Sequence, residues 1–172
     1  MANLILNDFR CVEETDEAGW DSPYFVTFIG HPGTTPTSNV ITTRKDSWDN
    51  NIGSGSYRAP QMTVASGVDI KTLVLVALME EDVNPDITGA NLTKVRDTMQ
   101  WWCSGVGSVS GISLTQLAAE VRPEFVKALN KFCVNDDNVD VHRLPITTLS
   151  GLLPLLHFFG WDGHYRVRFK MA

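Results

Sequence analysis

Residues 73–79, Leu-Val-Leu-Val-Ala-Leu-Met, form an unbroken apolar run that limits the fold more than any other segment. A strand with one face in water alternates apolar and polar residues, so this continuous run predicts a strand that is buried on both faces. Residues 23–30 are rich in aromatic and β-branched side chains and predict a second strand. Residues 163–171 alternate apolar and charged side chains, which is the pattern of a half-buried strand. Further strands are predicted at 3–12 and 39–43.

The middle of the chain has helical instead of strand-like patterns, over about residues 91–133. Ser113 is a good N-cap, and Gln116, three residues later, completes a capping box. Pro123 interrupts the apolar stripe that follows and is predicted to divide it into two short helices. Strands surround this segment, and no linker separates two cores. The sequence therefore predicts a mainly β fold with one domain over residues 1–172, an antiparallel β-sandwich with a helical insertion at about 91–133.

The charge balance excludes partners that depend on long-range attraction to a basic protein. The 172 residues include 14 Lys and Arg against 20 Asp and Glu, which gives a formal net charge of −6 at pH 7. Such a chain gains nothing from long-range attraction to nucleic acid or to an anionic lipid surface. A local basic strip or a bound cation would still reverse the sign of the charge at one spot.

Three further features bear on the compartment of the protein. The N-terminal residues lack both the basic and the long apolar region of a secretory signal, which predicts a cytoplasmic protein or one exported by another route. The apolar stretch at residues 149–161 is too short for a membrane span, which needs about 20 residues. Cys11, Cys103 and Cys133 lack the spacing of a structural zinc site. We expect buried reduced thiols, with a bridge between two of them as the alternative.

Carboxylates concentrate in two segments between predicted strands. Residues 13–21 follow the first strand, and residues 80–86 follow the apolar run. Calcium takes about six to eight oxygen ligands from flexible loops, and two acidic loops at one end of a sandwich would supply them. Without a cation, crowded carboxylates raise one another's pKa values. The alternative is that both segments are solvated turns, and residues 134–140 are likewise interpreted as a turn or as a separate weak cation site.

The first acidic segment continues as Asp21-Ser22-Pro23-Tyr24-Phe25-Val26 and resembles the acidic loop, Asp-Pro-Tyr motif and strand of the calcium- and phospholipid-binding C-two-type β-sandwich family. Residues 73–89 are similar to a later strand and the second calcium loop of that family. Trp48 stands where the family often carries a tryptophan, and the resemblance covers roughly residues 4–90. It implies a β-sandwich that binds calcium through Asp16, Asp21, Glu80, Asp82 and Asp86.

Arg166, Arg168 and Lys170 share one face of the last predicted strand and form a basic ladder on an acidic protein. Such a ladder would bind a phosphate or an anionic lipid headgroup. The alternative is the solvated face of an edge strand, where charge prevents aggregation. Trp20, within the first acidic segment, would add aromatic contact with a partner.

No segment carries a catalytic motif together with its structural context. The chain has neither Gly-x-Ser-x-Gly nor a phosphate-binding loop, and its histidines are dispersed, although Asp140–His142 and Asp162–His164 are near neighbours in the sequence. We therefore favour a non-enzymatic β-sandwich binding module, calcium-dependent, that engages a lipid headgroup, a glycan or a protein. A membrane-active or host-directed toxin or effector, and a small hydrolase, are the two alternatives.

Overall fold

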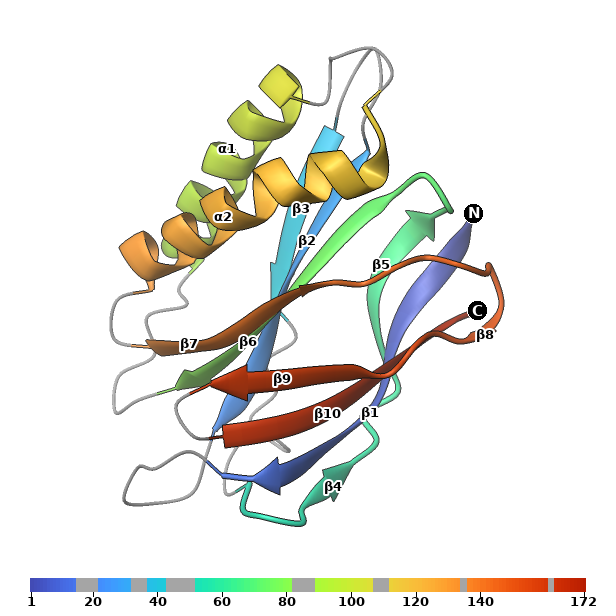
Figure 1. Ribbon diagram of the computed structural model, residues 1–172, viewed down its shortest axis with the longest axis vertical. Helices are drawn as coiled ribbons and strands as arrows, with labels where there is room; N and C mark the ends of the chain where they lie inside the picture. The colour runs from blue at the N-terminus through green and yellow to red at the C-terminus, as the bar shows by residue number, and fades with distance from the viewer. Residues whose placement is uncertain are drawn as a thin grey trace.

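The computed structural model describes residues 1–14, 22–31, 37–42, 52–81, 89–106, 112–133, 136–160 and 163–172. Within these ranges the chain forms two antiparallel sheets and two helices, and its two ends lie close together (Figure 1). The elements in chain order are β1 (Ala2–Glu13), β2 (Pro23–His31), β3 (Thr37–Thr42), β4 (Tyr57–Arg58), β5 (Met62–Val68), β6 (Leu73–Glu81), α1 (Gly89–Val106), α2 (Leu114–Phe132), β7 (Asp136–Arg143), β8 (Gly151–Leu152), β9 (Leu156–Gly160) and β10 (Gly163–Met171).

The two sheets are built from segments far apart in the sequence. The six-stranded sheet has the order β4-β1-β10-β8, with β5 also paired to β1 and β9 also paired to β10. The four-stranded sheet has the order β3-β2-β6-β7. Both helices lie between β6 and β7 in the sequence and cover one side of the four-stranded sheet (Figure 1). The predicted mainly β fold with a helical insertion is therefore confirmed.

The first core lies between the two sheets. Phe25 of β2 contacts the ring of Phe9 on β1 at 5.6 Å and the ring of Phe158 on β9 at 6.3 Å, both edge to face. These rings belong to one cluster of buried side chains that both sheets supply. Burial of apolar surface from both sides is the main force that holds the sheets together.

The second core lies between the four-stranded sheet and the helices, and β6 contributes to both cores. Residues 73–79 have no exposed surface, which confirms the prediction of a strand buried on both faces. Val74, Val76 and Leu78 belong to the core between the sheets, whereas the alternate residues belong to the core under the helices. This division follows from the two-residue period of a strand.

Helix α2 differs from the sequence prediction at Pro123. The capping box of Ser113 and Gln116 is present, but the helix runs unbroken from Leu114 to Phe132 with Pro123 inside it, so the predicted division into two helices is wrong. A proline removes the hydrogen bond to the carbonyl four residues earlier, which belongs here to Ala119. Pro123 and Ala119 are both exposed, so that carbonyl lies on the solvent side, while the buried stripe from Leu117 to Leu129 packs on the sheet without interruption.

The third acidic segment also differs from its prediction. Residues 136–140, interpreted as a turn, form the first part of β7 and pair with β6, with Asp137 opposite Glu80 and Asp140 opposite Leu78. Asn and Asp are rare in strands, so local propensity did not favour this element. Pairing with a buried strand supplies the backbone hydrogen bonds and outweighs that propensity.

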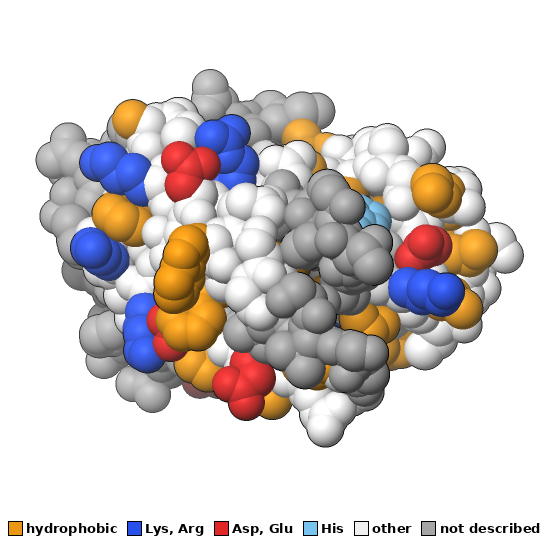
Figure 2. All heavy atoms as spheres, turned by 90° about the horizontal axis from the view of Figure 1, so that it is seen from above, with side chains coloured by type: hydrophobic (Ala, Val, Ile, Leu, Met, Phe, Trp, Pro, Cys, Tyr) orange, Lys and Arg blue, Asp and Glu red, His pale blue; other side chains and the backbone are white. Residues whose placement is uncertain are grey.

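The cysteines have the environment predicted from the sequence. Cys11, Cys103 and Cys133 are buried, and no disulfide joins any two of them. Burial raises the pKa of the Cys103 thiol. In the described part of the chain, neither α1 nor α2 has the length and apolar composition needed to cross a membrane. Around the helices, hydrophobic side chains reach the surface in small groups between charged ones (Figure 2).

Candidate functional site

The outer face of the six-stranded sheet carries the basic ladder predicted from the sequence. In β10 the odd-numbered residues are buried in the core, and the even-numbered ones, from His164 to Lys170, point away from it. The described helices cover the other sheet and leave this face uncovered (Figure 1). We call it the basic face, and its side chains are Asp8, Arg10, Tyr57, Leu152, Leu155, His157, Phe159, His164, Arg166, Arg168 and Lys170.

The register of β1 and β10 places two arginines directly opposite each other. Arg10 is the partner of Arg166, and Asp8 is the partner of Arg168. A shift in register between Leu6 and Asp8 brings Asp8 and Arg10 to this arrangement. Like charges directly opposite each other on neighbouring strands are destabilising. The pairing of Arg10 with Arg166 therefore lowers stability unless an anion lies between them.

A pocket of about 340 Å³ opens on this face, around the paired arginines. Its volume is in the range of small-molecule sites, which is roughly 300–1,000 Å³. Tyr57 of β4 and Leu155, just before β9, supply apolar surface beside the charged groups. The lining residues are Asp8, Arg10, Tyr57, Leu155, Arg166 and Arg168, and no histidine is among them.

The one carboxylate of the pocket neutralises only one of its arginines. Asp8 is 6% exposed and accepts a hydrogen bond of 3.1 Å from Nε of Arg168. Among the residues that the structure describes, neither Arg10 nor Arg166 has a carboxylate within ion-pair distance. The pocket thus carries a net positive charge on a protein of formal net charge −6, and two guanidinium groups are available to an anion.

Lys170 lies outside the pocket and has another partner. Its Nζ donates to Oε1 of Gln61, and Nε2 of Gln61 in turn donates to the backbone oxygen of Asn7 at 2.7 Å. Of the three basic residues predicted to bind, Arg168 contacts Asp8 and Lys170 contacts Gln61, whereas Arg166 has no carboxylate partner among the described residues. Sequence reasoning missed Arg10, because only the register of β1 against β10 places it opposite Arg166.

Exposed apolar side chains border the basic residues on the side of β8 and β9. Phe159 is 59% exposed and Leu152 is 55% exposed, and Leu155 is also exposed. Leu152 lies opposite Lys170, and Phe159 lies opposite His164, so the basic and apolar side chains run side by side. A surface of this kind suits a ligand that combines a negative charge with an apolar part.

The described residues that border the acidic segments lie together at one end of the four-stranded sheet. Pro23 of β2 is opposite Glu80 of β6, which is opposite Asp137 of β7. Glu80 is 4% exposed, and its Oε1 accepts a hydrogen bond of 3.1 Å from the backbone N–H of Ser22. The ends of β2, β6 and β7 that border the acidic segments are therefore neighbours in the sheet. The predicted ligands Asp16, Asp21, Asp82 and Asp86, and the predicted contact residue Trp20, lie outside the described residues.

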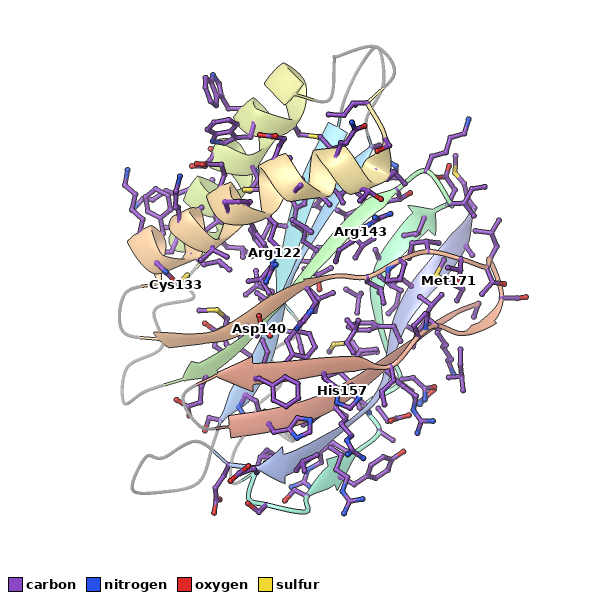
Figure 3. All side chains as sticks on the ribbon, in the orientation of Figure 1. Arg122, Cys133, Asp140, Arg143, His157 and Met171 are labelled. Atoms are coloured by element: carbon purple, nitrogen blue, oxygen red, sulfur yellow. The ribbon has the colours of Figure 1, made fainter. Side chains whose placement is uncertain are left out.

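Asp140 and His142, neighbours in the sequence, form a hydrogen-bonded pair at 2.7 Å. The same carboxylate lies 3.6 Å from Arg122 of α2 and accepts the backbone N–H groups of Val141 and Phe159 (Figure 3). Partial burial raises the pKa of Asp140, but the hydrogen bond and charge of His142 and the two backbone donors outweigh it, so the pKa lies below its usual value. With these partners, Asp140 joins α2, β7 and β9.

His157 and His164 form a second side-chain pair, at the edge of the basic face. Nδ1 of His157 lies 3.1 Å from Nε2 of His164, and the ring of Phe159 stacks on His164 at 4.2 Å. Partial burial lowers the pKa of His164, as do the positive charges of His157 and Arg166, while Glu13 opposes them. Asp162, the sequence neighbour considered for His164, lies outside the described residues.

Comparison with known proteins adds no relative: no family model, no curated protein and no solved structure matches the chain. The resemblance to the C-two-type family therefore stays a prediction. Over the described ranges, no group of three or more His, Cys, Asp or Glu side chains is arranged to hold a metal ion. The pocket on the basic face is the candidate site with the most complete geometry.

Proposed function

We propose that the protein is a non-enzymatic binding module that holds an anionic group in the pocket of the basic face. The observation that carries the proposal is the direct pairing of Arg10 with Arg166, two guanidinium groups without a carboxylate partner in the described structure. A phosphate, sulfate or carboxylate between them would accept hydrogen bonds from both and relieve their repulsion. The anion would belong to a lipid headgroup, a glycan or a protein side chain.

The surroundings of the arginines support a ligand with an apolar part. Leu155 and Tyr57 line the pocket, and Leu152 and Phe159 are exposed beside it. Charged groups on the open face supply attraction at short range, although the protein as a whole is acidic. The attraction is screened over about 8–10 Å at physiological salt, so binding weakens as the ionic strength rises.

Substitution of the paired arginines tests this proposal. We expect Arg166→Gln and Arg10→Gln each to weaken binding at least about tenfold, which corresponds to about 1.4 kcal/mol. Binding is measured with inorganic phosphate, with a sulfated glycan, and with vesicles of phosphatidylserine against vesicles of phosphatidylcholine. The three probes separate a free anion, a glycan and a membrane surface as sources of the negative charge.

Arg96→Gln is the matched control, since Arg96 is an exposed arginine of α1, away from the basic face. It removes the same charge and should leave binding unchanged. Without ligand, Arg10→Gln should keep or slightly raise the free energy of unfolding, because a like-charged pair is removed. Equal losses of binding in all three variants, or no binding of any probe by the wild type, would contradict the proposal.

Calcium binding at the acidic end of the four-stranded sheet is a second candidate function. The neighbouring positions of Pro23, Glu80 and Asp137 support it, because they bring the ends of three acidic segments to one edge. A cation held there would turn an acidic surface into a positive docking point. Asp16, Asp21, Glu80, Asp82 and Asp86 are the proposed ligands.

Melting curves in calcium and in chelator test this second candidate. A ligand at a hundredfold excess over its Kd stabilises the folded state by about 2.7 kcal/mol, so calcium should raise Tm measurably. Asp21→Asn and Asp82→Asn should abolish the rise, whereas Asp97→Asn, on the exposed surface of α1, should keep it. A rise that persists in the first two variants removes these residues from the set of ligands.

A further inference from the structure

The rings of His157 and His164 are arranged with two nitrogens facing each other. Nδ1 of His157 and Nε2 of His164 are 3.1 Å apart, and the ring planes differ by only 26°. His157 lies on β9 (Figure 3), and His164 lies on the neighbouring strand β10. His157 is opposite Arg166, and His164 is opposite Phe159. Both side chains are half-buried, so each keeps part of its surface in contact with solvent.

Aromatic stacking holds the two imidazoles in place. The Phe159 ring lies on His164 at 4.2 Å and is nearly parallel to His157 at 6.1 Å. A stacked ring limits the rotation of its neighbours, so little side-chain entropy is lost when a third group binds both nitrogens. The two rings are therefore held next to each other before an ion binds.

The distance between the nitrogens fits a shared metal ion. Zinc–imidazole bonds are about 2.0–2.1 Å, and a tetrahedral angle between two of them separates the nitrogens by about 3.3 Å. The ring centroids are 5.4 Å apart, so the two nitrogens point almost directly at each other. To share an ion, the nitrogens move apart by a few tenths of an ångström, and each ring turns by roughly 35° so that its lone pair points at an ion beside the line that joins them. In the metal-free pair, the N–H of one nitrogen donates a hydrogen bond to the other nitrogen, because a neutral imidazole has one donor and one acceptor nitrogen. That proton moves to the far nitrogen of its own ring when both facing nitrogens bind a metal.

We propose that His157 and His164 form a two-histidine site for a divalent transition-metal ion such as zinc or copper. Water completes the coordination, since the described residues around the pair supply no third ligand. Glu13, opposite His164 on β1, adds a negative charge that offsets the nearby Arg166. The proposal is independent of the anion pocket, because anion binding by the arginines requires no metal.

Thermal melting and calorimetry with zinc test the site on the full chain. Zinc should raise Tm and bind with a stoichiometry of one, and EDTA should reverse the rise. We expect His157→Gln and His164→Gln each to raise the Kd for zinc at least about tenfold, since one of two ligands is lost. Copper binding, followed by electron paramagnetic resonance, should show two coordinated imidazole nitrogens in the wild type and one in each variant.

His31→Gln is the matched control, because His31 lies at the end of β2, in the other sheet. It should bind zinc as the wild type does. The three buried cysteines are present in every variant, so binding to thiols would survive both substitutions and would overturn the proposal. The absence of a Tm rise in the wild type at millimolar zinc would overturn it as well.

Discussion

Asp140 links three elements that are distant from one another in the sequence. Its carboxylate accepts from His142 on its own strand and from the backbone of Phe159 on β9, and it lies 3.6 Å from Arg122 of α2. Such charge-assisted hydrogen bonds are the stronger ones in proteins. Their effect appears in the lowered pKa of the carboxyl group. Asp140 therefore belongs to the structural framework.

We expect Asp140→Asn to lower the free energy of unfolding by about 1–3 kcal/mol at pH 7. The folded-state pKa lies below the unfolded value of about 3.9, so the carboxylate stabilises the folded state above about pH 4. This contribution is lost as the pH falls through the folded-state pKa. Urea denaturation of wild type and variant at pH 7, 5 and 3 should give a difference that shrinks only at the lowest pH.

Asp97→Asn is the control for this measurement. Asp97 pairs with Arg96 on the exposed side of α1, and such surface pairs contribute at most about 1 kcal/mol. A difference for Asp140→Asn that stays constant down to pH 3 would show that the negative charge is not what stabilises the junction.

At the scale of elements, α2 shows how tertiary packing outweighs a local signal. Pro123 is a strong helix breaker, yet the apolar stripe on either side of it packs on one sheet face and keeps the helix continuous. The capping box at Ser113 was predicted from two residues and is present, because its hydrogen bonds are local. Strand β7 was not predicted, because the hydrogen bonds that form it are not local. Its partner β6 lies more than fifty residues earlier in the sequence.

Pro123→Ala should raise the free energy of unfolding by about 2 kcal/mol. Proline costs about 3 kcal/mol relative to alanine inside a helix, and the loss of its restriction on the unfolded chain offsets roughly 0.4–1 kcal/mol of the gain. Urea denaturation followed by circular dichroism measures the change. Glu120→Ala, at an exposed position of the same helix, should stay within about 0.5 kcal/mol of the wild type. Destabilisation by Pro123→Ala would mean that the ring itself makes stabilising contacts.

At the scale of the whole molecule, two cores share the strands β2 and β6. Phe25 faces the six-stranded sheet, whereas Phe28, three residues later, contacts Phe125 of α2 at 6.0 Å. The helices therefore pack on the outside of a sheet whose inner face is already buried. The described helices thus leave the outer face of the six-stranded sheet uncovered, and the pocket of the basic face and the histidine pair both lie there.

The sequence alone determined the features that depend on local periodicity and composition. The unbroken apolar run predicted a strand buried on both faces, the alternation in residues 163–171 predicted which side chains of β10 point outward, and the cysteines were expected to be buried and reduced. Each prediction needs only the period of a strand or the usual environment of a residue type.

Only the tertiary structure decided which residues meet on the basic face. Arg10 and Arg166 are separated by more than 150 residues, and so are Asp8 and Arg168, and the pairing of β1 with β10 brings both pairs together. Strand register depends on long-range hydrogen bonds and on a shift near Leu6, neither of which has a local sequence signal. The composition of the pocket, and the contact between His157 and His164, follow from that register and from the pairing of β9 with β10.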